Sequence, residues 1–247
     1  MIEVTEQGGV AVLRLAHGKV NAMSMEFCEA LTARFAEIPP ARAVVMTATG
    51  RTFSAGVDLV RLLEGGAPYI RKFLPALSSM FAAVFSHPAP VVAAINGHAI
   101  AGGCVLACAA DKRLMARDGG RIGVTELLVG VPFPPVAMEI MRCAIAPQFF
   151  ADAIFSGATY TPLEAVARGF IHDVIEPQVL LERAVAAAKS LAALPSKAFA
   201  LSKRQIRAPA LERMQNPQLD AAIEQIWTAP ETLDHIRGYA ARTLGKS

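Results

Sequence analysis

Two glycine-containing turns are the segments of this sequence best suited to presenting backbone donors to a ligand. Residues 53–59 (FSAGVDL) and 96–104 (NGHAIAGGC) each follow an apolar run. Glycine lets backbone N–H groups approach a ligand closely, and the second turn opens a predicted helix, whose free N–H groups favour an anion. Neither turn has the G-x-G-x-x-G or G-x-x-x-x-G-K-[ST] spacing, so neither a dinucleotide site nor a P-loop is predicted. The alternative is that these glycines serve only the tight packing of strands against helices.

Composition and charge narrow the class of protein. The chain has 247 residues, 53% hydrophobic and 18% charged, which predicts a folded protein with a sizeable core. The 24 basic and 21 acidic residues are dispersed, so no nucleic-acid partner is expected. The four cysteines form no C-x-x-C pair and have no histidine at metal spacing. They are predicted to be small buried residues of a reducing compartment, with no metal site: Cys28, Cys104, Cys108 and Cys143.

The N-terminus and the most apolar stretch both predict ordinary folded elements. Residues 1–15 (MIEVTEQGGVAVLRL) lack a basic start before an apolar run, which favours strand structure over a signal peptide. Residues 89–110 are interrupted by polar residues and glycines, which suits a buried strand, turn and helix better than a membrane span. We therefore expect a cytoplasmic protein without a membrane partner.

The elements that position the two turns follow from hydrophobic periodicity. Helical spacing begins after Ser24, a predicted N-cap, and again after Thr161, where Pro162 and Glu164 complete a capping-box pattern. The chain is expected to break at residues 65–68 and to be helical or loop after residue 179. Strands are predicted at 10–15, 43–46, 91–95, 112–115, 121–124 and 171–175, and helices at 24–38, 70–85, 104–110, 136–145, 148–155 and 161–168. This order predicts an α/β architecture with a C-terminal helical segment.

The two turns and their flanking segments resemble the enoyl-CoA hydratase/isomerase (crotonase) family over nearly the whole chain. The segments that carry the resemblance are KVNAMS (19–24), FSAGVDL (53–59), PVVAAINGHAIAGG (90–103) and IGVTELLVG (122–130). The resemblance implies a crotonase-like spiral of ββα units over residues 1–190. It also implies a C-terminal helical segment, residues 191–247, that trimerises and covers the active site. A homotrimer or hexamer would then bind coenzyme A as part of its acyl-CoA thioester substrate, with no permanently bound cofactor.

The resemblance also assigns roles to residues of the two turns. The backbone N–H groups of Val57 and Gly102 would form an oxyanion hole that polarises the thioester carbonyl, where losing one donor typically costs roughly 3 kcal/mol. The nucleotide and pantetheine arm would be held by Lys19, Val20, Ala22, Ala55, Asp58 and Leu59. For Lys19, an exposed turn lysine is the alternative to a phosphate contact.

Glu126 matches the second of the two glutamates that family hydratases use, whereas Val105 occupies the position of the first. The apolar residues around Glu126 are expected to raise its pKa, which suits a base that takes and returns a proton. One carboxylate with an oxyanion hole fits the migration of a double bond, as in the Δ3-Δ2-enoyl-CoA isomerases of fatty-acid degradation. Pro134 lies where the additional aspartate of dienoyl-CoA isomerases would be expected.

Other functions stay open at the level of sequence. Glu126 could serve a hydratase, lyase or hydrolase of the same family, or the chain could be a catalytically silent acyl-CoA-binding protein. Glu139 would supply a second carboxylate if its helix turned it inward, and Tyr239 is either an interface residue or part of the acyl pocket. That pocket is expected to be lined by residues 62–85, by Phe133 and by the C-terminal helices.

Overall fold

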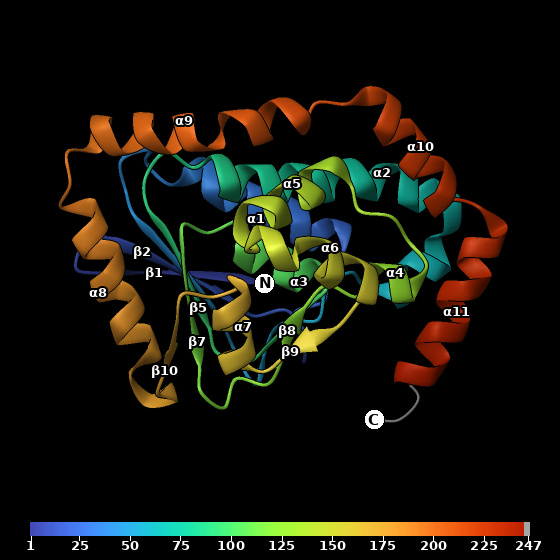
Figure 1. Cartoon of the computed structure of the whole chain (residues 1–247), viewed down its shortest axis with the longest axis horizontal. Coiled ribbons are helices and arrows are strands. Elements are labelled where there is room, and N and C mark those ends of the chain that lie inside the picture. The colour runs from blue at the N-terminus through green and yellow to red at the C-terminus, as the bar shows by residue number, and fades with distance from the viewer. Residues whose placement is uncertain (245–247) are drawn as a thin grey trace.

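The computed structural model describes residues 1–244 and contains two β-sheets surrounded by helices (Figure 1). The larger sheet has the strand order β1-β2-β3-β5-β7-β10 and the smaller sheet the order β4-β6-β8-β9. Pairing is antiparallel for β1 with β2 and for β8 with β9, and parallel elsewhere. The strands are β1 (Ile2–Gln7), β2 (Val10–Leu15), β3 (Val44–Ala48), β4 (Thr52–Ser54), β5 (Val91–Ile95), β6 (His98–Ile100), β7 (Lys112–Ala116), β8 (Ile122–Gly123), β9 (Thr159–Tyr160) and β10 (Asp173–Ile175).

Three consecutive ββα units, from Val44 to Val129, form the central part of the molecule. Each unit places its first strand in the larger sheet and its second strand in the smaller one, and a helix follows. The units are β3-β4-α2, β5-β6-α3 and β7-β8-α4, with α2 at Leu59–Ser86, α3 at Gly102–Cys108 and α4 at Glu126–Val129. Because the units stack with parallel strands, the turns between each second strand and its helix lie next to one another. The predicted spiral thus brings the two glycine turns together.

The central strands of the larger sheet, β2, β3, β5 and β7, are buried on both faces, as expected for parallel strands covered by helices on each side, whereas the edge strand β1 is largely exposed. Alternate residues of β5 enter two different clusters: Val91 and Ala93 pack in the main core with α1, α2, α3 and α5, and Val92 packs beneath α8. The other helices are α1 (Met25–Glu37), α5 (Pro135–Ala144), α6 (Pro147–Ser156), α7 (Pro162–Arg168) and α8 (Leu180–Ala192), with a 3₁₀ turn at Pro177–Val179.

Three C-terminal helices form an arch over the spiral (Figure 1). They are α9 (Ser196–Arg213), which packs on α5, α10 (Pro217–Trp227), which packs on α2, and α11 (Pro230–Leu244), which contacts α2 and α4. The predicted boundary between residues 190 and 191 falls inside α8, which packs on the larger sheet and ends at Ala192. The division of the chain at that boundary stays a prediction.

Most predicted elements are present, and the differences have local causes. Ser24 caps α1 through Phe27 N, and Thr161 and Glu164 form the capping box of α7. The N-terminal stretch is two strands rather than one, since Gly8 and Gly9 both have positive φ and turn the chain. The predicted break occurs at Gly66, although α2 already begins at Leu59. The strands β4, β6 and β9 and the helix α4 were not predicted, because two to four residues are too few for a periodic pattern.

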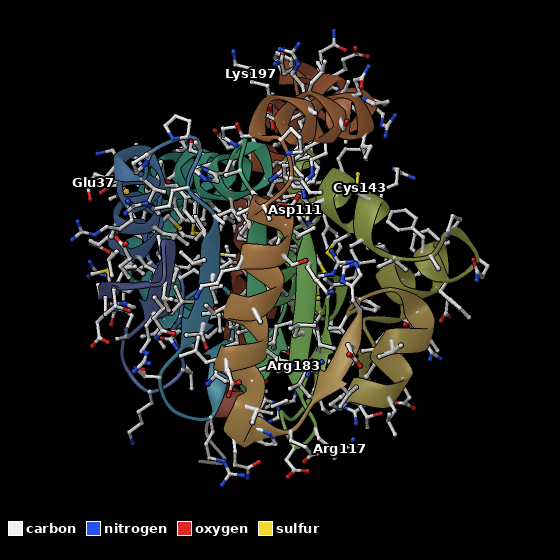
Figure 2. The ribbon with its side chains drawn as sticks, turned by 90° about the vertical axis from the view of Figure 1, so that its left-hand side faces the viewer. Glu37, Asp111, Arg117, Cys143, Arg183 and Lys197 are labelled. Atoms are coloured by element: carbon white, nitrogen blue, oxygen red, sulfur yellow. The ribbon has the colours of Figure 1, made fainter. Side chains whose placement is uncertain are left out.

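One prediction about the cysteines is wrong. Cys28, Cys104 and Cys108 are buried, but Cys143 is exposed on the outer side of α5 (Figure 2), where the helical period turns Arg142 and Cys143 toward solvent. Residues 1–244 hold no group of three or more His, Cys, Asp or Glu side chains that could bind a metal ion.

No single described helix is long and apolar enough to cross a membrane. Two helical segments, Pro177–Ala192 and Ser196–Arg213, meet such criteria only as a pair bent by 102°.

A buried ion-pair network fastens α9 to the spiral. Asp111 lies inside the molecule below α9, whereas Lys197 stands exposed on that helix (Figure 2). The Asp111 carboxylate pairs with Lys203 Nζ at 2.7 Å and Arg207 Nη2 at 2.8 Å, and it accepts a hydrogen bond from Val91 N at 2.7 Å. Burial lowers the pKa of Lys203 to about 8, and the Asp111 carboxylate opposes this effect. One carboxylate thus compensates two buried cations.

We predict that Asp111→Asn destabilises the protein by about 3–5 kcal/mol, because it leaves two buried cations without a counter-charge. Urea unfolding followed by circular dichroism measures this free energy. Asp234→Asn is the matched control, because Asp234 and Arg237 form an exposed pair, and it should change stability by less than about 0.5 kcal/mol. Equal stability losses in the two variants would contradict the importance of the network.

Candidate active site

A cavity of about 480 Å³ lies where the two glycine turns meet α2, α4 and the C-terminal helices. Its walls are mostly apolar, and Asp58, Glu126 and Tyr239 are the ionisable side chains of the described lining. The remaining lining residues are Val20, Ala22, Ala55, Val57, Leu59, Val60, Leu77, Phe81, Ile100, Ala101, Gly102, Val105, Thr125, Val129, Val131, Pro134, Ala137, Trp227 and Thr243. An apolar cavity with few polar groups is typical of a small-molecule site.

The two turns touch through the backbone of Gly56. A Cβ placed on Gly56 would lie 2.9 Å from Ile100 O and 3.0 Å from Gly102 N, and φ at Gly56 is +85°. Both the contact and the dihedral therefore exclude a side chain at this position. Gly102 is buried against Met23, whose Sδ would lie 3.1 Å from a Cβ on Gly102. The sequence alone left open whether these glycines serve packing, and the structure shows that packing requires Gly56.

Two backbone N–H groups at this contact are free to donate. Met23 forms a parallel bridge with Val57, in which Met23 N donates to Gly56 O and Asp58 N donates to Met23 O. That pattern turns the N–H of Val57 itself away from Met23. Gly102 is the first residue of α3, so its N–H has no partner inside the helix. Within residues 1–244, neither N–H has a hydrogen-bond acceptor.

Backbone strain is concentrated beside the cavity. Among the described residues, Asn21 (φ 49°) and Ala101 (φ 50°) are the non-glycine residues with positive φ, and such conformations typically cost about 1–3 kcal/mol each. Asn21 is held by a 2.7 Å hydrogen bond from His17 N to its Oδ1 and a 3.0 Å bond from its Nδ2 to Thr52 O. Ala101 precedes Gly102 directly, so the backbone conformation of Ala101 sets the direction in which the Gly102 N–H points.

Glu126 is the first residue of α4 and belongs to the lining of the cavity. The residue is 8% exposed, and its Oε2 atom has no hydrogen-bond partner in the described part of the chain. Burial raises the pKa of the Glu126 carboxyl to about 8, and the nearby backbone N–H groups of Glu126 and Thr125 offset this only in part. A carboxyl group in this state can exchange a proton with a ligand near neutral pH.

The structure gathers most of the predicted site residues at this cavity. Val57, Gly102 and Glu126 line it, as do five of the six residues assigned to the coenzyme A arm: Val20, Ala22, Ala55, Asp58 and Leu59. Lys19 is exposed in the neighbouring turn and is not part of the lining. Asp58 also caps α2, accepting a hydrogen bond from Arg61 N at 3.1 Å.

Predictions about the rest of the pocket had mixed outcomes. Glu139 supplies no second carboxylate, because it is buried in ion pairs with Arg142 (3.1 Å) and Arg213 (2.7 Å) outside the cavity. Phe133 is buried in the main core, and its neighbour Pro134 lines the cavity instead. Tyr239 belongs to the lining, as one of its two predicted roles requires.

Trp227 is a lining residue that the sequence analysis missed. No motif surrounds it, and its being the single tryptophan of the chain was the one available signal. Val105 lines the same cavity and is fully buried.

The chain is similar in sequence and in fold to several known proteins. A sequence profile described as enoyl-CoA hydratase/isomerase matches residues 5–241. A putative enoyl-CoA hydratase of Thermus thermophilus is 32% identical, covering 98% of this chain and 96% of that protein. Human mitochondrial enoyl-CoA delta isomerase 1 is 26% identical, covering 91% and 76%.

Among solved structures, human mitochondrial delta3-delta2-enoyl-CoA isomerase superposes with a TM-score of 0.93 at 24% identity, covering 100% of this chain and 99% of that one. This likeness confirms the predicted crotonase-like fold.

We predict that Gly56→Ala costs about 2–5 kcal/mol of stability, since positive φ costs roughly 1–2 kcal/mol and the contact with Gly102 adds about 1–3 kcal/mol. Gly9→Ala is the matched control: Gly9 has the same φ of +85°, with nothing within 4 Å of the added Cβ. Chemical unfolding of both variants measures the difference. The close approach of the turns would be unimportant if Gly56→Ala were no worse than Gly9→Ala.

We also predict that Glu126 makes stability fall as pH rises. Its pKa of about 8 exceeds the ordinary 4.5, so the folded protein holds one more proton than the unfolded chain between these values. Stability from this group is complete below about pH 4.5 and is lost by about pH 8, at up to about 1.4 kcal/mol per pH unit. Glu126→Gln should remove this slope. Unfolding of both proteins from pH 5 to 9 checks it, and parallel curves would mean that Glu126 is solvated.

Proposed function

The chain belongs to the enoyl-CoA hydratase/isomerase family, whose members act on acyl-CoA thioesters, and we propose that it shifts the double bond of a 3-enoyl-CoA to the 2-position. The observation that carries this proposal is the pairing of two free backbone N–H groups with a single buried carboxylate in an apolar cavity. The proposal assigns a role to each of these groups.

Val57 N–H and Gly102 N–H bind the thioester carbonyl oxygen in this proposal. When a proton leaves C2, negative charge moves onto that oxygen, and fixed donors stabilise it without reorganising. The strained backbone at Ala101 and the close contact at Gly56 support a rigid placement of the Gly102 donor. Low polarity in the cavity strengthens the interaction further.

Glu126 acts as the proton shuttle. Its carboxylate removes a proton from C2, the C3–C4 double bond becomes part of a dienolate, and the same carboxyl group returns the proton to C4. One C–H bond breaks and one forms, so neither water nor a redox partner is consumed. The raised pKa makes the carboxylate a stronger base than an exposed glutamate, and the resulting acid can still return its proton.

Val105 favours isomerisation over hydration. A hydratase of the type that the resemblance implies would hold its water between two carboxylates, and an apolar side chain occupies the first position here. Asp58, the other acidic residue of the described lining, is engaged as the N-cap of α2. Among the described lining residues, Glu126 is thus the one carboxylate that does not cap a helix, which leaves one general base and no free second carboxylate for positioning water.

We propose that the coenzyme A arm enters along the turn residues that line the cavity mouth. Val20 and Ala22 belong to one segment, and Ala55, Asp58 and Leu59 to the other. Lys19 is exposed beside Val20, where it can reach a phosphate without lining the acyl pocket.

The test is conversion of a 3-enoyl-CoA to the conjugated 2-enoyl-CoA, followed by ultraviolet absorbance. We expect conversion by the wild-type protein, with kcat/KM rising with pH and reaching half of its plateau value near pH 8 as Glu126 ionises. Glu126→Gln should lower kcat by roughly 10²–10⁴-fold, because the amide cannot accept the proton. The matched control is Glu139→Gln, an equally buried glutamate outside the cavity, which should keep its activity.

A 2-enoyl-CoA of the same chain length provides the contrasting measurement. Loss of conjugation from that substrate, with little migration from the 3-enoyl-CoA, would replace our proposal by hydration. The name of the Thermus thermophilus relative makes hydration the second candidate. Binding of acyl-CoA without either reaction would indicate a silent binding protein.

A further inference from the structure

Side chains of the C-terminal helices form hydrogen bonds to two backbone carbonyls of the turn that follows Glu126. Trp227, the last residue of α10, donates a hydrogen bond from Nε1 to Pro132 O at 2.9 Å. His235 on α11 forms a hydrogen bond from Nε2 to Leu128 O at 3.1 Å. Because a carbonyl only accepts, His235 Nε2 must carry a proton, as it does in one neutral tautomer and in the cation. The two contacted carbonyls lie on either side of Gly130.

The turn formed by residues 126–132 has little stability of its own. Helix α4 is a single turn of four residues, and a helix that short depends on outside contacts. Its hydrogen bonds close back on the catalytic segment: Val131 N donates to Glu126 O at 3.0 Å, and Leu128 N donates to Thr125 O at 3.0 Å. A shift of the turn would therefore move Glu126 with it.

The ring of His235 lies close to the backbone of the turn at Gly130. Gly130 ends α4 with φ +90°, and a Cβ at this position would lie 2.6 Å from His235 Cδ2. Figure 1 shows α11 descending beside α4, and the two helices are in contact. His235 is exposed and does not line the cavity, whereas Trp227 is buried and does.

We propose that His235 and Trp227 are positioning residues, which hold the turn formed by residues 126–132 so that the Glu126 carboxylate faces the apolar cavity. This inference rests on the proposed role of Glu126 as the base. His235 reaches the carboxylate only through the backbone of the turn, so its effect is on the orientation and solvation of Glu126 rather than on the substrate.

His235→Leu tests the proposal. We expect kcat to fall on the order of 10–100-fold with KM nearly unchanged, because small misplacements of a catalytic group have effects of this size. The acid limb of the kcat/KM profile should also move below pH 8 as water reaches the carboxylate. His235→Gln should restore most of kcat, since the glutamine amide can donate the same hydrogen bond. Trp227→Phe, which keeps a ring but loses the N–H, should also lower kcat.

Glu224→Gln is the matched control on α10. It removes the exposed ion pair with Arg71 (3.4 Å) and leaves both contacts with the turn in place, so kcat and the pH profile should stay at wild-type values. An equal loss of kcat in Glu224→Gln would overturn the proposal, since general loosening of the arch would then explain the effect. An unchanged pH profile in His235→Leu would overturn it as well.

A second measurement separates this inference from the proposed reaction. The contribution of Glu126 to the pH dependence of stability is obtained by comparing the free energy of unfolding of a protein with that of its Glu126→Gln variant at each pH. This measurement needs no substrate. We expect the window that now ends near pH 8 to end at lower pH in the His235→Leu background. That result would support the positioning role even if the wild-type protein isomerised nothing, and an unchanged window would refute it.

Discussion

The close approach of two backbone segments at Gly56 and Gly102 is the contact on which the rest of the site depends. It exists because successive ββα units stack with parallel strands, which puts the end of β4 beside the end of β6. Neither segment can move away from the other without breaking the pairing of β4 with β6. The gap between the two segments is too narrow for a side chain on Gly56. Two unpaired N–H groups are thereby held at one edge of an apolar cavity, and the strain at Ala101 is the energetic cost of that arrangement.

The burial of Glu126 also lowers the stability of the folded protein. A buried carboxylate with one unpartnered oxygen is expensive in an apolar cavity, and the group responds by holding its proton to higher pH. The same property makes the carboxyl group suitable for moving a proton between two carbons. The burial of Glu126 therefore lowers the stability of the protein at the position where the chemistry is proposed. Elsewhere, the buried ion pairs of Asp111 and the packing of helices on both faces of the larger sheet stabilise the structure.

The C-terminal helices connect these two parts of the molecule. Helix α9 is fastened to the spiral by Lys203 and Arg207, and α10 and α11 continue from it to the turn after Glu126. The arch therefore closes the cavity with Trp227 and Tyr239 and also contacts the backbone that carries the carboxylate. The same helices thus cover the cavity and contact the turn that carries Glu126, the proposed general base.

Local patterns in the sequence determined the periodic elements, the caps at Ser24 and Thr161, and, through the resemblance, the identity of Val57, Gly102 and Glu126 as candidate site residues. These features depend on residues close together in the chain, so spacing is enough to read them. Only the tertiary structure decided that Glu139 pairs with arginines outside the cavity, that Cys143 is exposed, and that Trp227 and His235 reach the turn of Glu126. Those contacts join segments up to 107 residues apart, and their geometry follows from how whole helices pack, which no local pattern encodes.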